Sequence, residues 1–119
     1  MPVHEALCKA DILIIASPVY CLGFPSPVKT IFDRTQQYFE AKFSLGILKP
    51  IAKYKKAYFF TAHGSSNPAG ISTMEDQLRL IFRVFNADLK TTIIAPNTDK
   101  IPLDTKVLKK KMEEIVLCL

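Results

Sequence analysis

Three short apolar runs divide the sequence and predict β-strands. They lie at residues 11–16, 57–62 and 91–95, are rich in β-branched or aromatic residues, and each ends in a turn signal. Because apolar residues do not alternate with polar ones in these runs, the pattern is typical of strands that are buried on both faces.

The segment after the first run has helical spacing. Ser26 is expected to cap this helix, and Pro27 is expected to occupy its first position, where proline is favoured. The apolar face of the helix consists of Val28, Ile31, Phe32, Thr35 and Phe39. Residues 44–56, which follow, are expected to form a long connection.

Two later segments have the same spacing. Residues 72–75, Ser-Thr-Met-Glu, form a capping box, in which each side chain satisfies a backbone amide, and predict that a helix begins there. Its apolar stripe consists of Leu78, Ile81, Phe82 and Phe85. A last helix is expected from about Asp104, and its stripe consists of Leu108, Met112, Ile115 and Leu119. A short helix ending around Cys8 is expected before the first strand.

The elements therefore follow the order β-α-β-α-β-α, which predicts an α/β protein with a parallel sheet and right-handed crossovers. The length of 119 residues suits one domain. Apolar residues make up 49% of the chain and charged residues 23%, which excludes disorder. The longest apolar run, residues 12–16, is far too short to span a membrane, so no membrane is expected among the partners.

The net charge of +5 comes from 16 basic against 11 acidic residues. The excess lies at residues 53–56 and 106–111, and both segments are interpreted as solvated surface. No helix-turn-helix, RNP-like or zinc-finger pattern accompanies Arg79 and Arg83 on the polar side of their helix, so nucleic acid is not the expected partner.

The number and spacing of the cysteines favour a reducing compartment. Cys8, Cys21 and Cys118 are odd in number and lack any C-x-x-C spacing, so reduced thiols are expected, and neither disulfides nor a structural zinc site. No secretory signal precedes the first strand, and a cytoplasmic location is expected.

The candidate chemistry lies in the loops that follow the first two strands, since open parallel sheets bind ligands at the carboxyl ends of their strands. The first loop, residues 17–27, combines three prolines, a glycine and two aromatic residues. Such a stiff loop exposes backbone amides and a flat apolar surface, which suits a planar ligand such as a flavin. A rigid turn whose aromatic residues cover the core is an equal alternative.

The second loop, residues 61–70, is small and polar, and it suits the floor or lid of such a cleft as well as an ordinary surface connection. His63 is placed to hydrogen-bond a ligand or to titrate near neutral pH, although a polar residue at a strand end is the commoner role. The sequence contains no G-x-G-x-x-G, P-loop, G-x-S-x-G or H-E-x-x-H motif, so classical dinucleotide, nucleotide, hydrolase and zincin sites are not expected.

The first strand, loop and helix carry a longer motif. Residues 10–20 read ADILIIASPVY and residues 27–34 read PVKTIFDR. This pattern resembles the A-D-x-I-I-x-x-S-P-V-Y … L-K-x-x-x-D-R signature of the NADPH-dependent FMN reductase and multimeric flavodoxin families, and the resemblance covers essentially the whole chain. It implies a three-layer flavodoxin-like parallel sheet, FMN as cofactor, NAD(P)H as co-substrate, and a quinone, nitro, azo, flavin or metal acceptor.

The resemblance also implies which residues contact the flavin ring, since the two loops lie on either side of it in the family. The implied residues are Ser17, Pro18, Val19, Tyr20, Cys21, Gly23 and Phe24 in the first loop and His63, Gly64 and Ser65 in the second. The family usually has a glycine pair where this chain has His63-Gly64. The flavin performs the chemistry, so no catalytic side chain and no metal ligand is expected.

The family begins with a strand and a G-S-x-R-like loop that holds the FMN phosphate at a helix N-terminus, and residues 1–10 do not match it. The chain is therefore expected to be a single partial domain over residues 1–119 that contains only the three C-terminal strands (3-4-5) and lacks the phosphate-binding βαβ portion. FMN binding is then expected to be weak or absent. The first strand is expected to become an edge that pairs with another chain in a homo-oligomer.

Three functions remain open on these grounds. The leading one is an FMN-dependent NAD(P)H oxidoreductase. A flavodoxin-like electron carrier is the first alternative, against which the charge of +5 argues mildly, since such carriers usually have an acidic surface. The second alternative is a cofactor-free oligomerisation or regulatory module. The sequence does not indicate the electron acceptor or the choice between NADH and NADPH.

Overall fold

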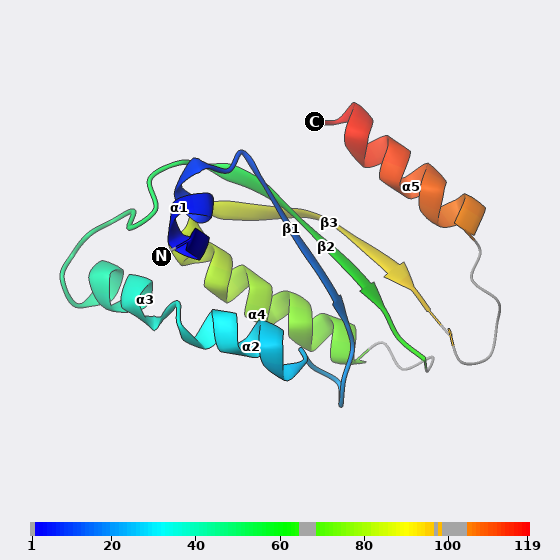
Figure 1. The fold of residues 1–119 in the computed structure, drawn as a ribbon, viewed down its shortest axis with the longest axis horizontal. Coiled ribbons are helices and arrows are strands. Elements are labelled where there is room, and N and C mark those ends of the chain that lie inside the picture. The colour runs from blue at the N-terminus through cyan, green and yellow to red at the C-terminus, as the bar shows by residue number, and fades with distance from the viewer. Residues whose placement is uncertain (1, 65–68, 97, 99–104) are drawn as a thin grey trace.

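The computed structural model describes residues 2–64, 69–96, 98 and 105–119, which contain a three-stranded parallel sheet. Strands β1 (Ile12–Pro18), β2 (Lys55–Ala62) and β3 (Ala87–Ala95) lie side by side in the order β1-β2-β3 (Figure 1). The predicted α/β architecture with parallel strands is confirmed, and the strands are longer than the apolar runs that predicted them.

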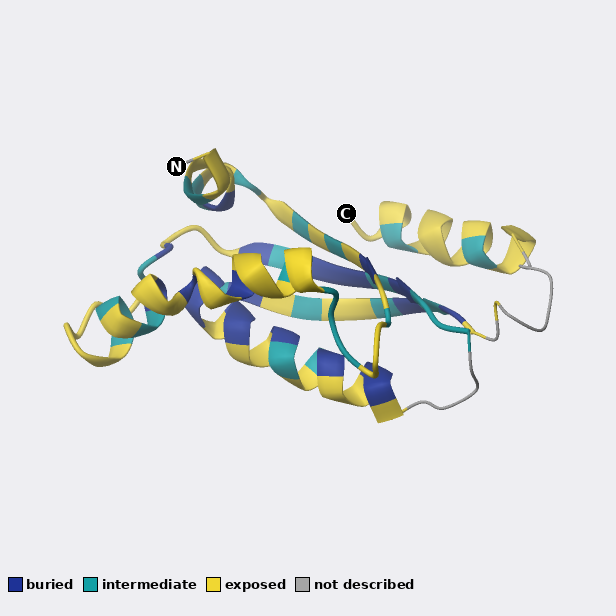
Figure 2. Ribbon diagram, turned by 60° about the horizontal axis from the view of Figure 1, so that its bottom comes forward, coloured by how far each residue is buried: buried dark blue, intermediate teal, exposed yellow. Residues whose placement is uncertain are grey.

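Helices lie on both faces of this sheet. Helices α2 (Ser26–Asp33), α3 (Gln36–Phe43) and α4 (Ala69–Phe85) are on one side, and α5 (Thr105–Leu117) is on the other (Figures 1 and 2). Helix α1 (Pro2–Lys9) precedes β1, as the sequence predicts. The described residues therefore form the three layers that were expected. No helix among them is long and apolar enough to cross a membrane.

The hydrophobic core lies between the sheet and α4. Phe59 of β2 is fully buried, and Met74, Leu78 and Phe82 of α4 pack in the same cluster. Leu7 of α1 joins this cluster from the N-terminal end of the chain. Since burial of each large apolar side chain stabilises the fold by about 1.5–3 kcal/mol, this layer carries most of the stability.

Strand β1 forms one edge of the sheet, as expected, but it is not buried on both faces. Leu13 and Ile15 pack against the core, whereas Ile12 and Ile14 on the opposite face are 37% and 53% exposed. The prediction of burial on both faces is wrong for this strand, because α5, the helix on that side, packs against β3. An apolar face and an open strand edge therefore meet along β1.

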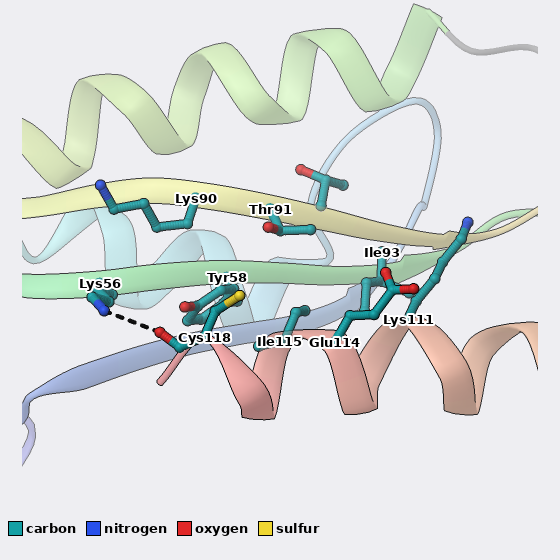
Figure 3. A pocket seen from close by; sticks show the side chains of 10 residues that line it. Lys56, Tyr58, Lys90, Thr91, Ile93, Lys111, Glu114, Ile115 and Cys118 are labelled. Atoms are coloured by element: carbon teal, nitrogen blue, oxygen red, sulfur yellow. Dashed lines mark hydrogen bonds between the residues drawn. The ribbon is translucent and has the colours of Figure 1, made fainter.

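Helix α5 covers its face of the sheet loosely. Leu108 and Ile115 of the predicted stripe are half-buried, whereas Met112 and Leu119 are exposed. The expected start at Asp104 lies outside the described residues. Between α5 and the sheet lies a cavity of about 660 Å³ (Figure 3). Its lining includes Lys56, Tyr58, Lys90, Thr91, Ile93, Lys111, Glu114, Ile115 and Cys118.

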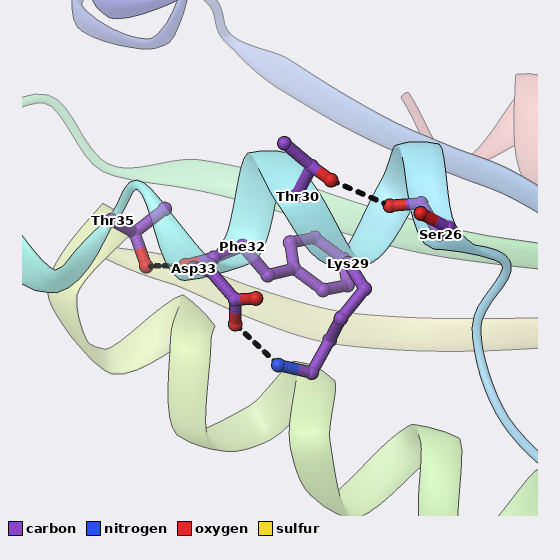
Figure 4. Close-up of polar contacts among 6 residues, drawn as sticks. All are labelled: Ser26, Lys29, Thr30, Phe32, Asp33 and Thr35. Carbon is purple, nitrogen blue, oxygen red and sulfur yellow. Dashed lines mark hydrogen bonds and ion pairs between the residues drawn. The ribbon is translucent and has the colours of Figure 1, made fainter.

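The helix predicted after the first strand is divided into α2 and α3. The cap residue of α2 is Pro25 in an extended conformation, and Ser26 is already helical, so the prediction that Ser26 caps the helix is wrong. Thr35 lies between the two helices, and its hydroxyl donates a hydrogen bond to the carbonyl of Phe32 at 2.6 Å (Figure 4). Threonine side chains that bond to a nearby carbonyl compete with regular helical structure, which accounts for the break.

Helix α4 begins three residues earlier than predicted. Residues 72–75 therefore lie inside the helix, where the Thr73 hydroxyl donates to the carbonyl of Ala69 at 3.1 Å, and the predicted capping box is wrong. Burial of Ile71 accounts for the additional turn, since tertiary packing supplies most helical stability. The carboxylate of Glu75 instead accepts a hydrogen bond from Thr92 of β3 at 3.0 Å.

Lys55 contradicts the interpretation of residues 53–56 as solvated surface. Its side chain is fully buried, and its ammonium group donates to the carbonyl oxygens of Lys53 at 2.6 Å and Phe85 at 3.1 Å. Phe85 is the last residue of α4, where unpaired carbonyls and the helix dipole favour a cation. Burial lowers the pKa of the Lys55 ammonium from its ordinary value.

Candidate functional site

The two loops singled out in the sequence lie next to each other. Pro18 at the end of β1 pairs in register with Ala62 at the end of β2. The Val19 amide then donates to the carbonyl of Ala62 at 3.2 Å, so the first loop leaves the sheet alongside the second. Ser17, which is buried, directs its hydroxyl to the carbonyl of Pro18 at 3.0 Å. The sequence therefore predicts correctly that both loops are at one edge of the sheet.

The first loop contains a tight, strained turn. Tyr20 and Gly23 exchange two backbone hydrogen bonds of 2.9 Å. The residues between them, Cys21 and Leu22, have φ angles of 50° and 63°, a left-handed conformation that is uncommon for residues other than glycine. Two such residues in succession form the hairpin turn that asparagine and glycine usually occupy. Each costs on the order of 1 kcal/mol or more, and such strain clusters at ligand-binding sites.

The two aromatic residues of this loop point in different directions. Tyr20 is 62% exposed and presents its ring at the surface. Phe24 packs inward, with ring centroids 5.0 Å from Phe32 and 5.7 Å from Phe59. The sequence left two equal alternatives for this loop, a surface for a planar ligand and a turn whose aromatic residues cover the core. The exposed ring of Tyr20 suits the first, and the packing of Phe24 corresponds to the second.

The second loop is attached to the end of β3. The His63 amide donates to the carbonyl of Ala95 at 3.1 Å, and the Thr98 amide donates to the carbonyl of His63 at 3.1 Å. Within the described residues, two buried side-chain atoms have no hydrogen-bond partner, Thr61 Oγ1 and His63 Nδ1. Buried polar atoms are rarely unsatisfied, so this pair is a candidate position for contact with a further group. Gly64 follows directly, and the predicted site residue Ser65 lies outside the described residues.

A shallow hollow of about 400 Å³ lies at the carboxyl ends of all three strands. This volume is within the range of about 300–1,000 Å³ that is typical of small-molecule sites. Its polar residues are Ser17 and Thr61, and the remainder of the lining is Ala16, Pro18, Phe60, Ala62, Ile93, Ala95, Leu108 and Met112. The structure therefore places two of the predicted site residues, Ser17 and Pro18, in this lining beside Thr61, whereas the other predicted site residues that the structure describes lie outside it.

Sequence reasoning missed the contributions of β3 and α5 to the hollow. Ile93 and Ala95 lie in an apolar run, and Leu108 and Met112 lie in a helical stripe, both of which are ordinary signals of core packing. Only the packing of α5 against the carboxyl ends of the strands distinguishes them. Among the described residues, no group of three or more His, Cys, Asp and Glu side chains is placed to hold a metal ion.

Replacement of Gly70 by alanine is expected to lower the free energy of unfolding by about 1–2 kcal/mol. A Cβ at this position in α4 would lie 3.0 Å from Cα and 3.3 Å from the carbonyl carbon of Leu22, in the strained turn. The usual gain from Gly→Ala in a helix is up to about 1 kcal/mol in the opposite direction. Urea unfolding measures the change, and Ser72→Ala, at an exposed position of the same helix, is the control. A Gly70→Ala variant at least as stable as the wild type would contradict this contact.

The solved structures that resemble this chain define its class as a flavodoxin-like α/β protein. The Trp repressor binding protein from Bacillus subtilis matches with a TM-score of 0.58 and 22% identity, over 80% of this chain and 56% of that one. A WrbA-like flavodoxin from Agrobacterium tumefaciens matches with a TM-score of 0.50 and 22% identity, over 71% and 48%. A flavone reductase matches with a TM-score of 0.63 and 15% identity, over 91% and 41%.

The family is narrower than this class. The sequence pattern of the NADPH-dependent FMN reductases matches residues 2–98, and the chain belongs to that family. The resemblance found in the motif at residues 10–34 is thereby confirmed. No curated protein matches the sequence. The chain spans between 41% and 56% of the length of the three solved structures.

Proposed function

We propose that this chain supplies the ring-binding wall of an FMN-dependent NAD(P)H oxidoreductase. The observation that carries the proposal is the pair of unsatisfied buried atoms, Thr61 Oγ1 and His63 Nδ1, at the carboxyl end of the central strand. Membership of the NADPH-dependent FMN reductase family supports FMN as the cofactor and NAD(P)H as the co-substrate. The electron acceptor is then a small molecule that reaches the exposed side of the ring.

The residues present fit the ring of a flavin. The hollow is mainly apolar, which suits the ring face, and the buried Thr61 hydroxyl near the end of β2 is a hydrogen-bond donor and acceptor without a partner among the described residues. Tyr20 adds an exposed aromatic surface in the loop that follows Pro18. Among the described residues, no lysine or arginine belongs to the lining, so contacts with the ring carry the affinity of this part of the wall.

When bound, FMN supplies the hydride transfer between NAD(P)H and the acceptor. The chain's own residues hold and orient the ring. The stiff segment from Ser17 to Pro18 presents it with a fixed apolar surface, and Phe60 and Ala62 exclude water from the side of the sheet. No side chain of this wall is required to act as an acid or a base.

The second candidate function is a cofactor-free oligomerisation module, which the exposed face and open edge of β1 favour. We propose that this edge pairs with a second copy of the chain, so that a homo-oligomer covers Ile12 and Ile14. An exposed apolar edge strand is a ready template for pairing with another chain. The oligomer is compatible with both functions, and flavin binding distinguishes them.

Titration of the protein with FMN and with riboflavin, followed by flavin fluorescence, tests the function. We expect weak binding of both, with similar dissociation constants, because the ring alone is held. Thr61→Val preserves the shape of the side chain and removes the hydroxyl, so it is expected to weaken flavin binding by roughly three- to tenfold. The matched control is Thr91→Val, an exposed threonine on β3 outside this hollow.

The outcomes separate the candidates. Absence of any flavin binding would overturn the proposal and favour the oligomerisation module. Equal flavin affinities of the wild type and Thr61→Val would contradict the role given to the Thr61 hydroxyl. Flavin binding without oxidation of NADPH would favour the electron carrier. A tight complex with FMN that survives dialysis would contradict the assignment of affinity to the ring alone.

A further inference from the structure

A thiol, an imidazole and a phenol form a continuous chain of contacts far from the flavin wall. His4 and Cys8 lie one turn apart on the same face of α1. The Cys8 Sγ atom is 3.6 Å from His4 Nε2, and His4 Nδ1 is 2.6 Å from the Tyr38 hydroxyl of α3. The rings of His4 and Tyr38 also stack, with centroids 5.6 Å apart and an angle of 15° between their planes.

Packing holds this arrangement in place. Tyr38 is buried, and its ring packs edge-on against Phe85 with centroids 5.9 Å apart. Burial raises the pKa of the Tyr38 hydroxyl, so that group stays protonated near neutral pH. His4 and Cys8 are only partly buried and remain within reach of a small molecule. A nucleophile, a base and a third group that orients the base are the elements of an activated nucleophile.

The charges around Cys8 bear on a thiolate. Cys8 is the residue next to the last in α1, and the carboxyl end of a helix disfavours an anion. The buried ammonium of Lys55 acts in the opposite direction. The pKa of Lys55 is lowered by its burial, and Cys8 is the neighbouring group that acts to raise it.

Within the described part of the chain, the other two cysteines have no imidazole partner. Cys21 is exposed in the strained turn of the first loop, and Cys118 is exposed next to the end of the chain. The chain contains two histidines, and the described contacts of His63 do not include a cysteine. In the described residues the imidazole therefore distinguishes Cys8 from the two thiols that are more exposed.

We propose that Cys8 is a nucleophilic thiol that adds to electron-poor alkenes such as α,β-unsaturated carbonyl compounds, with His4 as its base and Tyr38 as the positioning residue. When Nδ1 of His4 donates its proton to the Tyr38 oxygen, Nε2 is free to accept the proton of the Cys8 thiol. This site is independent of the proposed flavin wall.

The addition balances without an oxidant or a reductant. A bond forms between Cys8 Sγ and the β-carbon of the alkene, and the carbon–carbon π bond breaks. Its electron pair moves to the carbonyl oxygen as an enolate. The thiol proton passes to His4 Nε2 and then to the α-carbon of the adduct, which regenerates the neutral imidazole.

The test measures the rate at which N-ethylmaleimide modifies Cys8 in a chain that carries Cys21→Ser and Cys118→Ser, followed by mass spectrometry. Removal of the base by His4→Ala is expected to lower the rate at pH 7 by about tenfold or more. Added imidazole is expected to restore part of that rate. Tyr38→Phe keeps the ring and removes the hydroxyl, so a smaller loss is expected, and Tyr58→Phe, at a buried tyrosine of β2, is the control.

The role of the cluster is overturned if Cys8 reacts equally fast in all of these variants, or if it reacts only after unfolding in guanidinium chloride. A His4→Ala variant that reacts slowly but does not respond to imidazole also overturns the assignment of His4 as the base. If His4→Ala fails to fold, as judged by circular dichroism, the comparison of Tyr38→Phe with Tyr58→Phe decides. In that case equal rates reject the proposal, and a loss confined to Tyr38→Phe supports it.

Discussion

Phe59→Ala is expected to lower the free energy of unfolding by about 3–5 kcal/mol. Phe59 lies on the central strand β2, is fully buried in the core and packs against the ring of Phe24. Truncation removes the transfer free energy of the ring and leaves a cavity that the rigid sheet cannot close. Since domains of this size have a total stability of about 5–15 kcal/mol, the loss is a large part of the whole.

Urea unfolding followed by circular dichroism measures this effect. The control is Phe43→Ala at the end of α3, where the ring is 66% exposed and the change is expected to be within about 0.5 kcal/mol. Phe59→Leu keeps most of the volume and is expected to lie between the two. A loss below about 1 kcal/mol for Phe59→Ala would contradict the position of the core between the sheet and α4.

Phe59 also connects the core to the candidate site. The ring of Phe24, which it supports, lies in the loop that carries Tyr20 and the strained turn. In a Phe59→Leu variant that remains folded, the first loop loses part of this support. Packing in the core therefore helps to keep the proposed flavin wall rigid.

Ile14→Lys is expected to convert the proposed homo-oligomer into a monomer. Ile14 is 53% exposed on the uncovered face of the edge strand, so a lysine costs little in the free chain. In a symmetric interface the substitution occurs in both subunits, and each buried, unpaired ammonium costs several kcal/mol. The dissociation constant is therefore expected to rise by about a hundredfold or more.

Light scattering of the wild type and the variant at micromolar concentration gives the masses directly. The matched control is Ile31→Lys on α2, which introduces the same charge at a helix side chain that is 47% exposed. A wild type that is a monodisperse monomer would overturn the proposed pairing. An Ile14→Lys variant with the mass of an oligomeric wild type would place the interface elsewhere.

Local patterns in the sequence predicted much of the fold. The three apolar runs, the helical stripes and the alternation of the two indicated the parallel sheet and the order of its elements, because these patterns depend on neighbours along the chain. The errors occurred where a residue has a distant partner. Ser72 and Glu75 have the spacing of a capping box, but burial of Ile71 extends α4 past them.

The location of the candidate site was predicted from the sequence, but the directions of its side chains were not. The loops after β1 and β2 were expected at one edge, and strand register brings them there. Tyr20 and Phe24 are indistinguishable in the sequence, and their opposite directions depend on Phe32 and Phe59, which lie in other elements. The unsatisfied atoms of Thr61 and His63 also require knowledge of every neighbouring donor and acceptor.

The sequence by itself determined the α/β class, the family and the positions of the two loops, since each follows from residue types at short, fixed spacings. Only the tertiary structure decided that Lys55 is buried, that Ile14 is exposed, and that Tyr38 meets His4. Residues 4 and 38 belong to different helices, and no local pattern relates them. Burial and hydrogen bonding depend on what the fold places against a side chain. For this reason a lysine in a charged segment is buried here and an isoleucine in an apolar run is exposed.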